Sequence, residues 1–347
     1  MTRRILFALL ALGPITVLVS RLGGDDTLVF VLAAAGLVPL AWLIGEATDQ
    51  AAHHTGPGIG GFLNATFGNA PELIIALIAV QDGLTEVVRG SLTGSVIGNL
   101  LLVLGFSLLF GGRGEVDRES SLTSLVLVGV ATALFLIPSV PGFHGDPDRH
   151  SLAVASLPIS IVLLLLYLGT TWFSLRRHKT MHESENSEGA GSAMWSLKTS
   201  IVVLGIATVV TAFVAEALVH TLEAFADKLG LSDFFVAAVI VAIVGNAAEH
   251  GGAVVVAARG QIKLAAEIAL ASSSQVAVFL IPAVAILSWA IEPLALAFRE
   301  IELIMLGGST LLAAALLIHG RSSRARGATL IAAYVGVATA FFLVGDR

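Results

Sequence analysis

The sequence predicts an all-α polytopic membrane protein of about eleven transmembrane helices: one extra N-terminal helix and two inverted five-helix repeats. Three observations support this fold class. The composition is 56% hydrophobic and 13% charged over 347 residues, whereas soluble domains carry about 25% charged residues. Apolar stretches long enough to cross a bilayer recur along the whole chain. A short polar motif in the first half returns in the second half.

The expected spans follow from length, because a transmembrane helix needs roughly 20 mostly apolar residues. The first apolar run follows Arg3 and Arg4 like a signal peptide, but Pro14 interrupts it and no convincing cleavage site follows. We therefore expect residues 1–26 to hold a first helix outside the repeats. The expected spans are 4–21, 27–46, 58–81, 87–110, 121–140, 152–175, 199–223, 233–257, 262–288, 296–318 and 327–345.

The polar stretch 176–198 divides the remaining chain into two units of five expected spans, 27–175 and 199–347. Its Ser, Gly and Glu content is typical of a solvated linker. An odd number of spans per unit requires the second unit to lie inverted in the membrane. With the N-terminus inside, 13 of the 19 Lys and Arg lie on the inner side. We expect a cytoplasmic N-terminus, a C-terminus outside and a prokaryotic cytoplasmic membrane.

The repeated motif keeps a constant offset between the two units. Gly68-Asn69-Ala70 and Gly245-Asn246-Ala247 differ by 177 in residue number. A triplet alone could recur by chance in a chain rich in Gly and Ala. Three further pairs share the offset, and they make coincidence a poor explanation: Glu72 with Glu249, Ser95 with Ser272, and Glu46 with Glu223.

Glu72 and Glu249 are acidic residues deep inside apolar segments. A carboxylate at bilayer depth costs on the order of 2.5–3.5 kcal/mol on insertion scales, so it indicates function by default. Before Glu72, several glycines weaken the helix, and Pro71 frees a carbonyl one turn earlier. Broken helices survive at this depth where their freed backbone lines a cavity or protein core. The alternative is that the glycines only permit close helix packing.

Residues with neutral oxygen atoms that could bind a cation lie at helical spacing from both glutamates. Together with two carboxylates they suit Ca²⁺, which takes 6–8 oxygen ligands. Zinc and copper are less natural, because the chain has no Cys and no His-rich site. A single serine in a span more often donates its hydroxyl hydrogen bond to a backbone carbonyl of its own helix. The candidate donors are Asn64, Gly68, Asn69, Ser95 and Asn99 in the first half, and Gly245, Asn246, Ser272 and Gln275 in the second.

Other polar residues leave two interpretations open. His250 follows Glu249 and either relays a proton or fills a packing position. Glu46 and Asp49 end the second span and either line an inner entrance or form a solvated helix end. We expect Glu216 and Glu267 to be structural, with Glu267 paired to Lys263 one turn earlier.

These features indicate an ion-coupled transporter and not an enzyme. Two like charges in a dry site favour proton uptake, so protons and Ca²⁺ would compete for the same oxygens. Exposing that site to each side in turn would convert competition into exchange. No GxxxxGK[ST] loop indicates a nucleotide as energy source, and no cofactor is expected. The expected partners are Ca²⁺, H⁺ and the lipid bilayer, without nucleic acid; the oligomeric state is left open.

Two stretches resemble the repeats of the calcium/proton exchanger family of the calcium/cation antiporter superfamily. The first contains PLAWLIGEATDQAAHHTGPGIGGFLNATFGNAPELIIALIAV, and the second contains VGNAAEHGGAVVVAARG followed by ALASSSQVAVFLIP. The similarity covers about residues 39–105 and 234–282.

The resemblance implies eleven spans, a five-plus-five repeat and an acidic linker, which is less acidic in this chain. It implies that Glu72 and Glu249 bind Ca²⁺ and exchange it for protons, assisted by Asn69 and Asn246. It also implies helix breaks at Gly68 and Gly245, and flanking helices that face the site with Ser95, Asn99, Ser272 and Gln275.

Three other functions compete with that of a Ca²⁺/H⁺ antiporter. Sodium/calcium exchangers typically have Thr-Ser where this chain has Asn69-Ala70 and Asn246-Ala247, and this difference favours protons. An intramembrane hydrolase is disfavoured, because the chain has no HExxH or Gly-x-Gly-Asp motif. A passive cation channel would differ from an exchanger by not depending on a proton gradient.

Overall fold

The computed structural model describes residues 2–144, 149–182 and 195–345, and nearly all of them are helical. Most of the predicted linker, 183–194, lies outside the described residues. The first half contains α1 (Thr2–Leu9), α2 (Leu12–Arg21), α3 (Asp26–Phe67), α4 (Ala70–Gln81), α5 (Thr85–Ile97), η1 (Gly98–Val103), α6 (Leu104–Gly111), β1 (Gly114–Glu115), α7 (Arg118–Ser139), η2 (Val140–His144) and α8 (Arg149–His182).

The second half begins after the linker with the long helix α9, whose N-cap Ser196 accepts a hydrogen bond from the Thr199 N–H. Its elements are α9 (Leu197–Leu229), α10 (Asp233–Phe235), η3 (Val236–Val241), α11 (Ala242–Gly245), α12 (Ala247–Ala258), α13 (Ile262–Gln275), η4 (Val276–Leu280), α14 (Ile281–Leu287), η5 (Ser288–Ala290), α15 (Glu300–Leu317), β2 (Arg321–Ser322) and α16 (Arg324–Val344).

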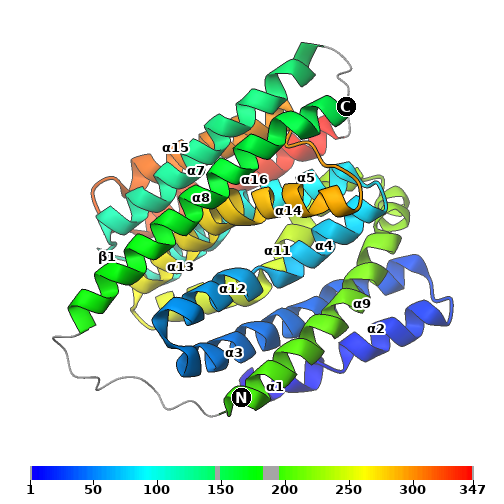
Figure 1. Ribbon diagram of the computed structural model, residues 1–347, viewed down its shortest axis with the longest axis horizontal. Helices are drawn as coiled ribbons and strands as arrows, with labels where there is room; N and C mark the ends of the chain where they lie inside the picture. The colour runs from blue at the N-terminus through cyan, green and yellow to red at the C-terminus, as the bar shows by residue number, and fades with distance from the viewer. Residues whose placement is uncertain (1, 145–148, 183–194, 346–347) are drawn as a thin grey trace.

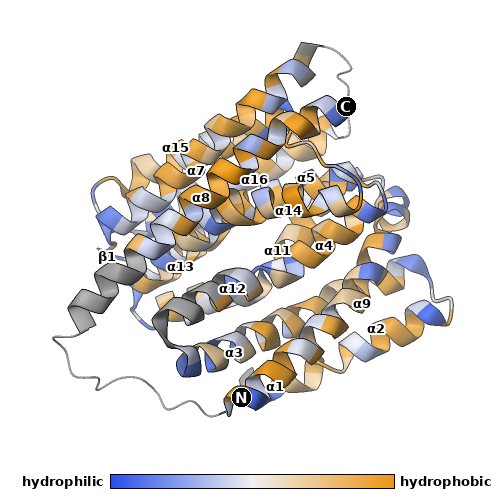
Figure 2. Ribbon diagram, in the orientation of Figure 1, coloured by the Kyte–Doolittle hydropathy of each residue, from blue (hydrophilic) through white to orange (hydrophobic). Residues whose placement is uncertain are grey.

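The all-α membrane fold is as expected, and the described residues account for most of the expected spans. They include nine helices long and apolar enough to cross a membrane. A tenth arises if the bent pair Asp233–Gly245 and Glu249–Ala258 is one span. The apolar residues run along the helices, and polar residues gather near many of the helix ends (Figure 2). The difference from eleven concerns the expected span 58–81, where α4 is a shorter apolar helix.

Helix α3 contains a sharp turn that explains this difference. A Cβ atom at Gly60 would lie 2.9 Å from the Cβ of Ala52. In a straight helix with a rise of 1.5 Å per residue, these residues would be about 12 Å apart along the axis. The chain therefore doubles back between them, as the ribbon shows (Figure 1). His53 and His54 lie in helical backbone beside this turn.

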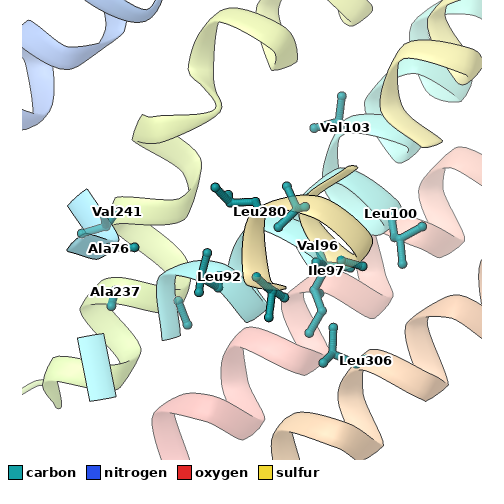
Figure 3. Packing of buried hydrophobic residues seen from close by; sticks show 14 of the residues in the cluster. Ala76, Leu92, Val96, Ile97, Leu100, Val103, Ala237, Val241, Leu280 and Leu306 are labelled. Atoms are coloured by element: carbon teal, nitrogen blue, oxygen red, sulfur yellow. The ribbon is translucent and has the colours of Figure 1, made fainter. Parts of the chain in front are cut away.

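The helices form a bundle in which the two halves interlock (Figure 1). Helix α3 packs along α9 of the other half, and α2 covers both. On the opposite side, α7 packs against both α8 and α15, and α16 packs against α6. One large hydrophobic cluster joins α5, η1, η3, η4 and α15 in the centre (Figure 3). Neither half therefore has a separate core.

Two helix breaks and two π-helices occupy matching places in the halves. The first break lies at Gly68 and Asn69 before α4, and the second lies at Asn246, where the flanking helices bend by 59°. The π-helices η1 and η4 each follow a helix that carries one of the matched serines, Ser95 or Ser272. Such π segments are frequent at functional sites.

A segment before α15 is extended and not helical, so the expected span 296–318 begins four residues later, at Glu300. Three serines on three helices accept hydrogen bonds from alternate backbone N–H groups of this segment: Ser288 from Leu294, Ser156 from Leu296 and Ser139 from Phe298, each at 2.9 Å. The side chains of the three donor residues, Leu294, Leu296 and Phe298, are buried. Its apolar composition alone had favoured helix, but the serines satisfy the extended backbone instead.

A two-stranded antiparallel ribbon joins the loops after α6 and α15, with Gly114 opposite Ser322. The Ser322 hydroxyl donates to the Gly112 carbonyl at 2.8 Å. Close by, Lys263 at the start of α13 forms an ion pair with Asp117 at 3.0 Å. This end of the bundle is thus tied together across the two halves.

Candidate ion site

The two glutamates that are 177 residues apart each lie in the first turn of the helix that follows a break. Glu72 lies in the first turn of α4 and Glu249 in the first turn of α12. Asn69 and Asn246 occupy the N-cap positions of these helices. A helix N-terminus carries partial positive charge and favours a nearby carboxylate. The breaks thus allow a negative charge to be held inside an apolar bundle.

A chain of hydrogen bonds connects the side chains around the breaks. The Asn246 amide donates to the Ser95 hydroxyl at 2.9 Å, and the Asn99 amide donates to the Ser272 hydroxyl at 2.9 Å. Asn99 also donates to the side-chain amide oxygen Oδ1 of Asn246 at 3.4 Å. Ser272 in turn donates to a carboxylate oxygen of Glu249. Five of the predicted residues, from both halves, therefore meet in one network.

Glu72 differs from Glu249 in its surroundings. Its side chain is 8% exposed and packs against Gly245, where a Cβ would lie 3.3 Å from the Glu72 Cγ. One of its carboxylate oxygens has no hydrogen-bond partner. Gly245 thus leaves room for the Glu72 side chain, and Glu72 retains an oxygen that can accept a cation or a proton.

The electrostatics of the site come from two nearby carboxylates. Glu72 and Glu249 are close enough to repel each other. In the described part of the chain, neither forms an ion pair with Lys or Arg. The same residues contain no group of three or more His, Asp or Glu poised for a metal ion. A bound cation would need amide, hydroxyl, backbone or water oxygens besides the two carboxylates.

Some predicted residues lie outside this network. Gln275 is half-buried at the C-terminal end of α13, and His250 is half-buried with its Nε2 unbonded. Asp49 is exposed on α3, and Glu46 accepts a hydrogen bond from Gln50 at 3.4 Å. Asn69 is buried at the break. The side chain of Asn64 lies outside the described residues.

The structure places the ion pairs near the two glutamates that were expected to be structural, Glu216 and Glu267. Glu216 forms an ion pair with Arg21 at 3.7 Å. Lys263, expected to pair with Glu267, forms its ion pair with Asp117 instead. Because Asp117 caps α7, this contact joins two helices, which the sequence spacing within one helix could not indicate.

Glu302 is a buried acidic residue that sequence reasoning missed, although it lies inside the expected span 296–318. Its side chain is 0% exposed, and neither of its oxygens has a hydrogen-bond partner. Arg89 of α5 lies 3.8 Å away. Its burial depends on Arg89 in α5, more than 200 residues earlier in the chain, so no pattern within its own span could have indicated it.

Comparison with known proteins identifies the family. The family model described as sodium/calcium exchanger protein matches residues 26–176 and 199–343. The chain belongs to the sodium/calcium exchanger family. It is therefore a multi-pass integral membrane protein of a family of transporters and not of enzymes. The two matched ranges of this exchanger leave out the first helix and the linker.

Two curated relatives of this exchanger cover nearly its whole length. It is 39% identical to the Ca(2+)/H(+) antiporter ChaA of Bacillus subtilis (strain 168), over 98% of this chain and 99% of the relative. It is 36% identical to the Ca(2+)/H(+) antiporter of Aphanothece halophytica, over 97% of this chain and 96% of the relative. The resemblance to calcium/proton exchangers is thereby confirmed.

Solved structures share its fold. Native YfkE matches with a TM-score of 0.83 and 37% identity, over 97% of this chain and 99% of that chain. The H+/Ca2+ exchanger CAX matches with a TM-score of 0.74 at 15% identity, over 99% of this chain and 92% of that chain. The sodium-calcium exchanger NCX_Mj matches less closely, with a TM-score of 0.57 and 20% identity, over 89% of this chain and 96% of that chain. The last two likenesses concern the fold alone.

Proposed function

We propose that the protein is a secondary active transporter that exchanges Ca²⁺ for H⁺ by alternating access at Glu72 and Glu249. The observation that carries the proposal is a pair of carboxylates beside matched helix breaks, the buried Glu72 and the half-buried Glu249. Amides and hydroxyls from both halves form a hydrogen-bond network that ends on Glu249. The names of the relatives in Bacillus subtilis and Aphanothece halophytica support the choice of Ca²⁺ and H⁺.

In this mechanism Ca²⁺ and protons share the same oxygens. Ca²⁺ binds when both carboxylates are ionised, because two negative charges then face one divalent cation. Protons displace it by neutralising the carboxylates, which removes the attraction. The Ser272 hydroxyl holds one Glu249 oxygen in place, while Glu72 keeps an unpartnered oxygen. Asn99 and Asn246 supply amide oxygens at the same level of the bundle.

The architecture proposed for this mechanism has two inverted units, 27–175 and 199–347, with an N-terminal helix and a linker outside them. Matching breaks at Asn69 and Asn246 and matching π-helices η1 and η4 support this division. We place the N-terminus in the cytoplasm and the C-terminus outside, in a prokaryotic cytoplasmic membrane. Because the chain has no Cys, single introduced cysteines and a membrane-impermeant thiol reagent can test this orientation in cells.

The function is tested in proteoliposomes with an imposed pH gradient and no sodium or potassium gradient. We expect labelled Ca²⁺ uptake by the wild type and its loss in Glu72→Gln and in Glu249→Gln, which keep side-chain size but not charge. Glu216→Gln is the matched control, because its partner is Arg21 away from the breaks.

Each other outcome of this experiment contradicts part of the proposal. Uptake that requires sodium would assign the protein to sodium/calcium exchange. Uptake down the Ca²⁺ gradient without proton counter-movement would indicate a channel. Full exchange in both Gln variants would rule out the two-carboxylate site.

A further inference from the structure

A group of four charged residues lies at the end of the bundle where α16 ends, close to Gly345. We call it the charge clamp: Glu86 and Arg89 on α5, and Arg299 and Glu302 at the start of α15. Arg89 and Arg299 each donate to Glu86. Arg89 Nε lies 3.8 Å from Glu302, whose side chain is 0% exposed. Two carboxylates thus balance two guanidinium groups; Glu302 is buried and the other three side chains are partly buried.

The charge clamp reaches further backbone elements through its arginines. Arg89 donates to the Ala297 carbonyl at 3.0 Å, at the end of the extended segment, and Arg299 donates to the Gly345 carbonyl at 2.7 Å, after α16. The Arg299 guanidinium also lies 5.3 Å from the ring centroid of Phe234 in α10, within the range of a cation–π contact. The clamp therefore joins α5 to α10, which begins the broken helix of the second half.

Directly beyond the clamp, α5 and the α10–η3 helix meet backbone to backbone. A Cβ at Gly90 would lie 2.8 Å from the Phe234 carbonyl oxygen, and a Cβ at Gly94 would lie 2.0 Å from that of Ala238. Ala237 of η3 and Leu92 of α5 lie in the cluster at this crossing (Figure 3). Only glycine permits so close an approach.

This crossing leads to the ion site. Ser95 follows Gly94 directly and accepts the hydrogen bond from Asn246 at 2.9 Å, while the Asn246 amide also donates to the Ala242 carbonyl at 2.9 Å. A change in the distance between the two helices would therefore separate Ser95 from Asn246.

We propose that the charge clamp holds α5 against α10 and η3, and thereby positions Ser95 and Asn246 for ion exchange. Its four residues are positioning residues that act through the helix crossing and do not touch the ion. Breaking a buried pair by removing one charge leaves an uncompensated partner, so a single neutral substitution weakens the whole clamp. The part of the inference that concerns ion exchange rests on the proposed function. The part that concerns the contact between α5 and the α10–η3 helix does not.

The test uses thiol labelling, because the natural chain has no Cys. Ala237→Cys places a thiol in the crossing, where Ala237 is 0% exposed and lies 3.1 Å from the Cβ position of Gly90. In detergent-purified protein, a water-soluble maleimide should label this thiol slowly. Adding Glu86→Gln or Arg299→Met should raise the labelling rate about tenfold or more, since both remove charge pairs of the clamp.

Two further variants separate positioning from general destabilisation. Arg299→Lys keeps the charge and should restore most of the protection. Arg21→Met breaks the ion pair with Glu216 elsewhere in the bundle and should leave labelling unchanged. If Glu86→Gln fails to fold by size-exclusion chromatography, Arg299→Met carries the comparison. Unchanged labelling in folded clamp variants, or an equal rise in Arg21→Met, overturns the proposal.

Transport gives the second readout. In proteoliposomes, Arg299→Met should raise the KM for Ca²⁺ more than it changes the maximal rate, and Arg299→Lys should restore the KM. An unchanged KM overturns the link to Ser95 and Asn246. Absence of transport in the wild type would refute the proposed function, while the labelling result would still decide whether the clamp holds the crossing.

Discussion

Gly94→Ala is expected to destabilise the protein, although alanine is a better helix former than glycine. The added Cβ would lie 2.0 Å from the Ala238 carbonyl oxygen and 2.7 Å from the carbonyl carbon. An ordinary C···O approach is about 3.3 Å, so α5 and η3 must separate by about 1.3 Å. The obstacle is backbone, which cannot rotate away as a flexible side chain would.

The magnitude follows from two opposing effects. Overpacking a close-packed interior costs about 1–3 kcal/mol, occasionally more, and a clash with backbone belongs at the upper end. Helix propensity offsets about 1 kcal/mol of this cost. The net loss in the free energy of unfolding is about 2 kcal/mol, or roughly 3 °C in Tm for a chain of this length.

Gly98→Ala is the matched control for this prediction. Gly98 lies one turn further along the same continuous helical run, and a Cβ there would meet no atom within 4 Å. The Gly98→Ala variant should have a free energy of unfolding equal to or higher than that of the wild type. Thermal unfolding of both purified variants in detergent makes the comparison. If Gly94→Ala were as stable as Gly98→Ala, the close backbone contact at the crossing would be refuted.

Three further predictions concern separate parts of the structure. Asn99→Ala should raise the KM for Ca²⁺ in proteoliposomes about tenfold or more, because it leaves buried oxygens of the network without their donor; an unchanged KM would remove Asn99 from the site. Ser139→Ala should lower the free energy of unfolding by about 1–3 kcal/mol, since the buried Phe298 N–H loses its acceptor, whereas Ser160→Ala, whose hydroxyl bonds its own helix, should change it little. The Ser120 N–H and the Lys263 ammonium hold the pKa of Asp117 below its ordinary value of 3.8, so its charge stabilises the fold above that pH and less as the pH falls through the lowered pKa. Asp117→Asn keeps the helix cap and should lower Tm at pH 7 but not at strongly acidic pH; an equal loss at both would contradict this.

Hydropathy and spacing were sufficient to predict the membrane fold and the meeting of the two halves. The reason is that both signals can be read along the chain itself: a span is a contiguous apolar run, and the matched residues keep one offset of 177 without insertion. The five residues joined by hydrogen bonds, Glu249 and four neutral residues from Ser95 to Ser272, were all among the predicted site residues. The roles of these residues in binding Ca²⁺ stay predictions.

Features that depend on distant partners could not be predicted. The segment containing Leu294, Leu296 and Phe298 is as apolar as a helix, and only the serines of other helices make it extended. Glu302 is buried beside Arg89 of the other half, a neighbour that no pattern within its own span reveals. The tight packing at Gly94 likewise depends on Ala238, which no pattern within α5 reveals.

The interlocking of the halves has a consequence for biosynthesis. Asn99 is inserted into the membrane 147 residues before its partner Asn246 leaves the ribosome. At a synthesis rate of about 5–20 residues per second, that interval lasts roughly 7–30 s. During this time the first half exposes Glu72, Ser95 and Asn99 without their partners from α11, α12 and α13. The nascent chain is therefore most vulnerable to quality-control proteolysis before its second half arrives, and substitutions that add polarity near Asn99 should reduce yield before they affect the finished protein.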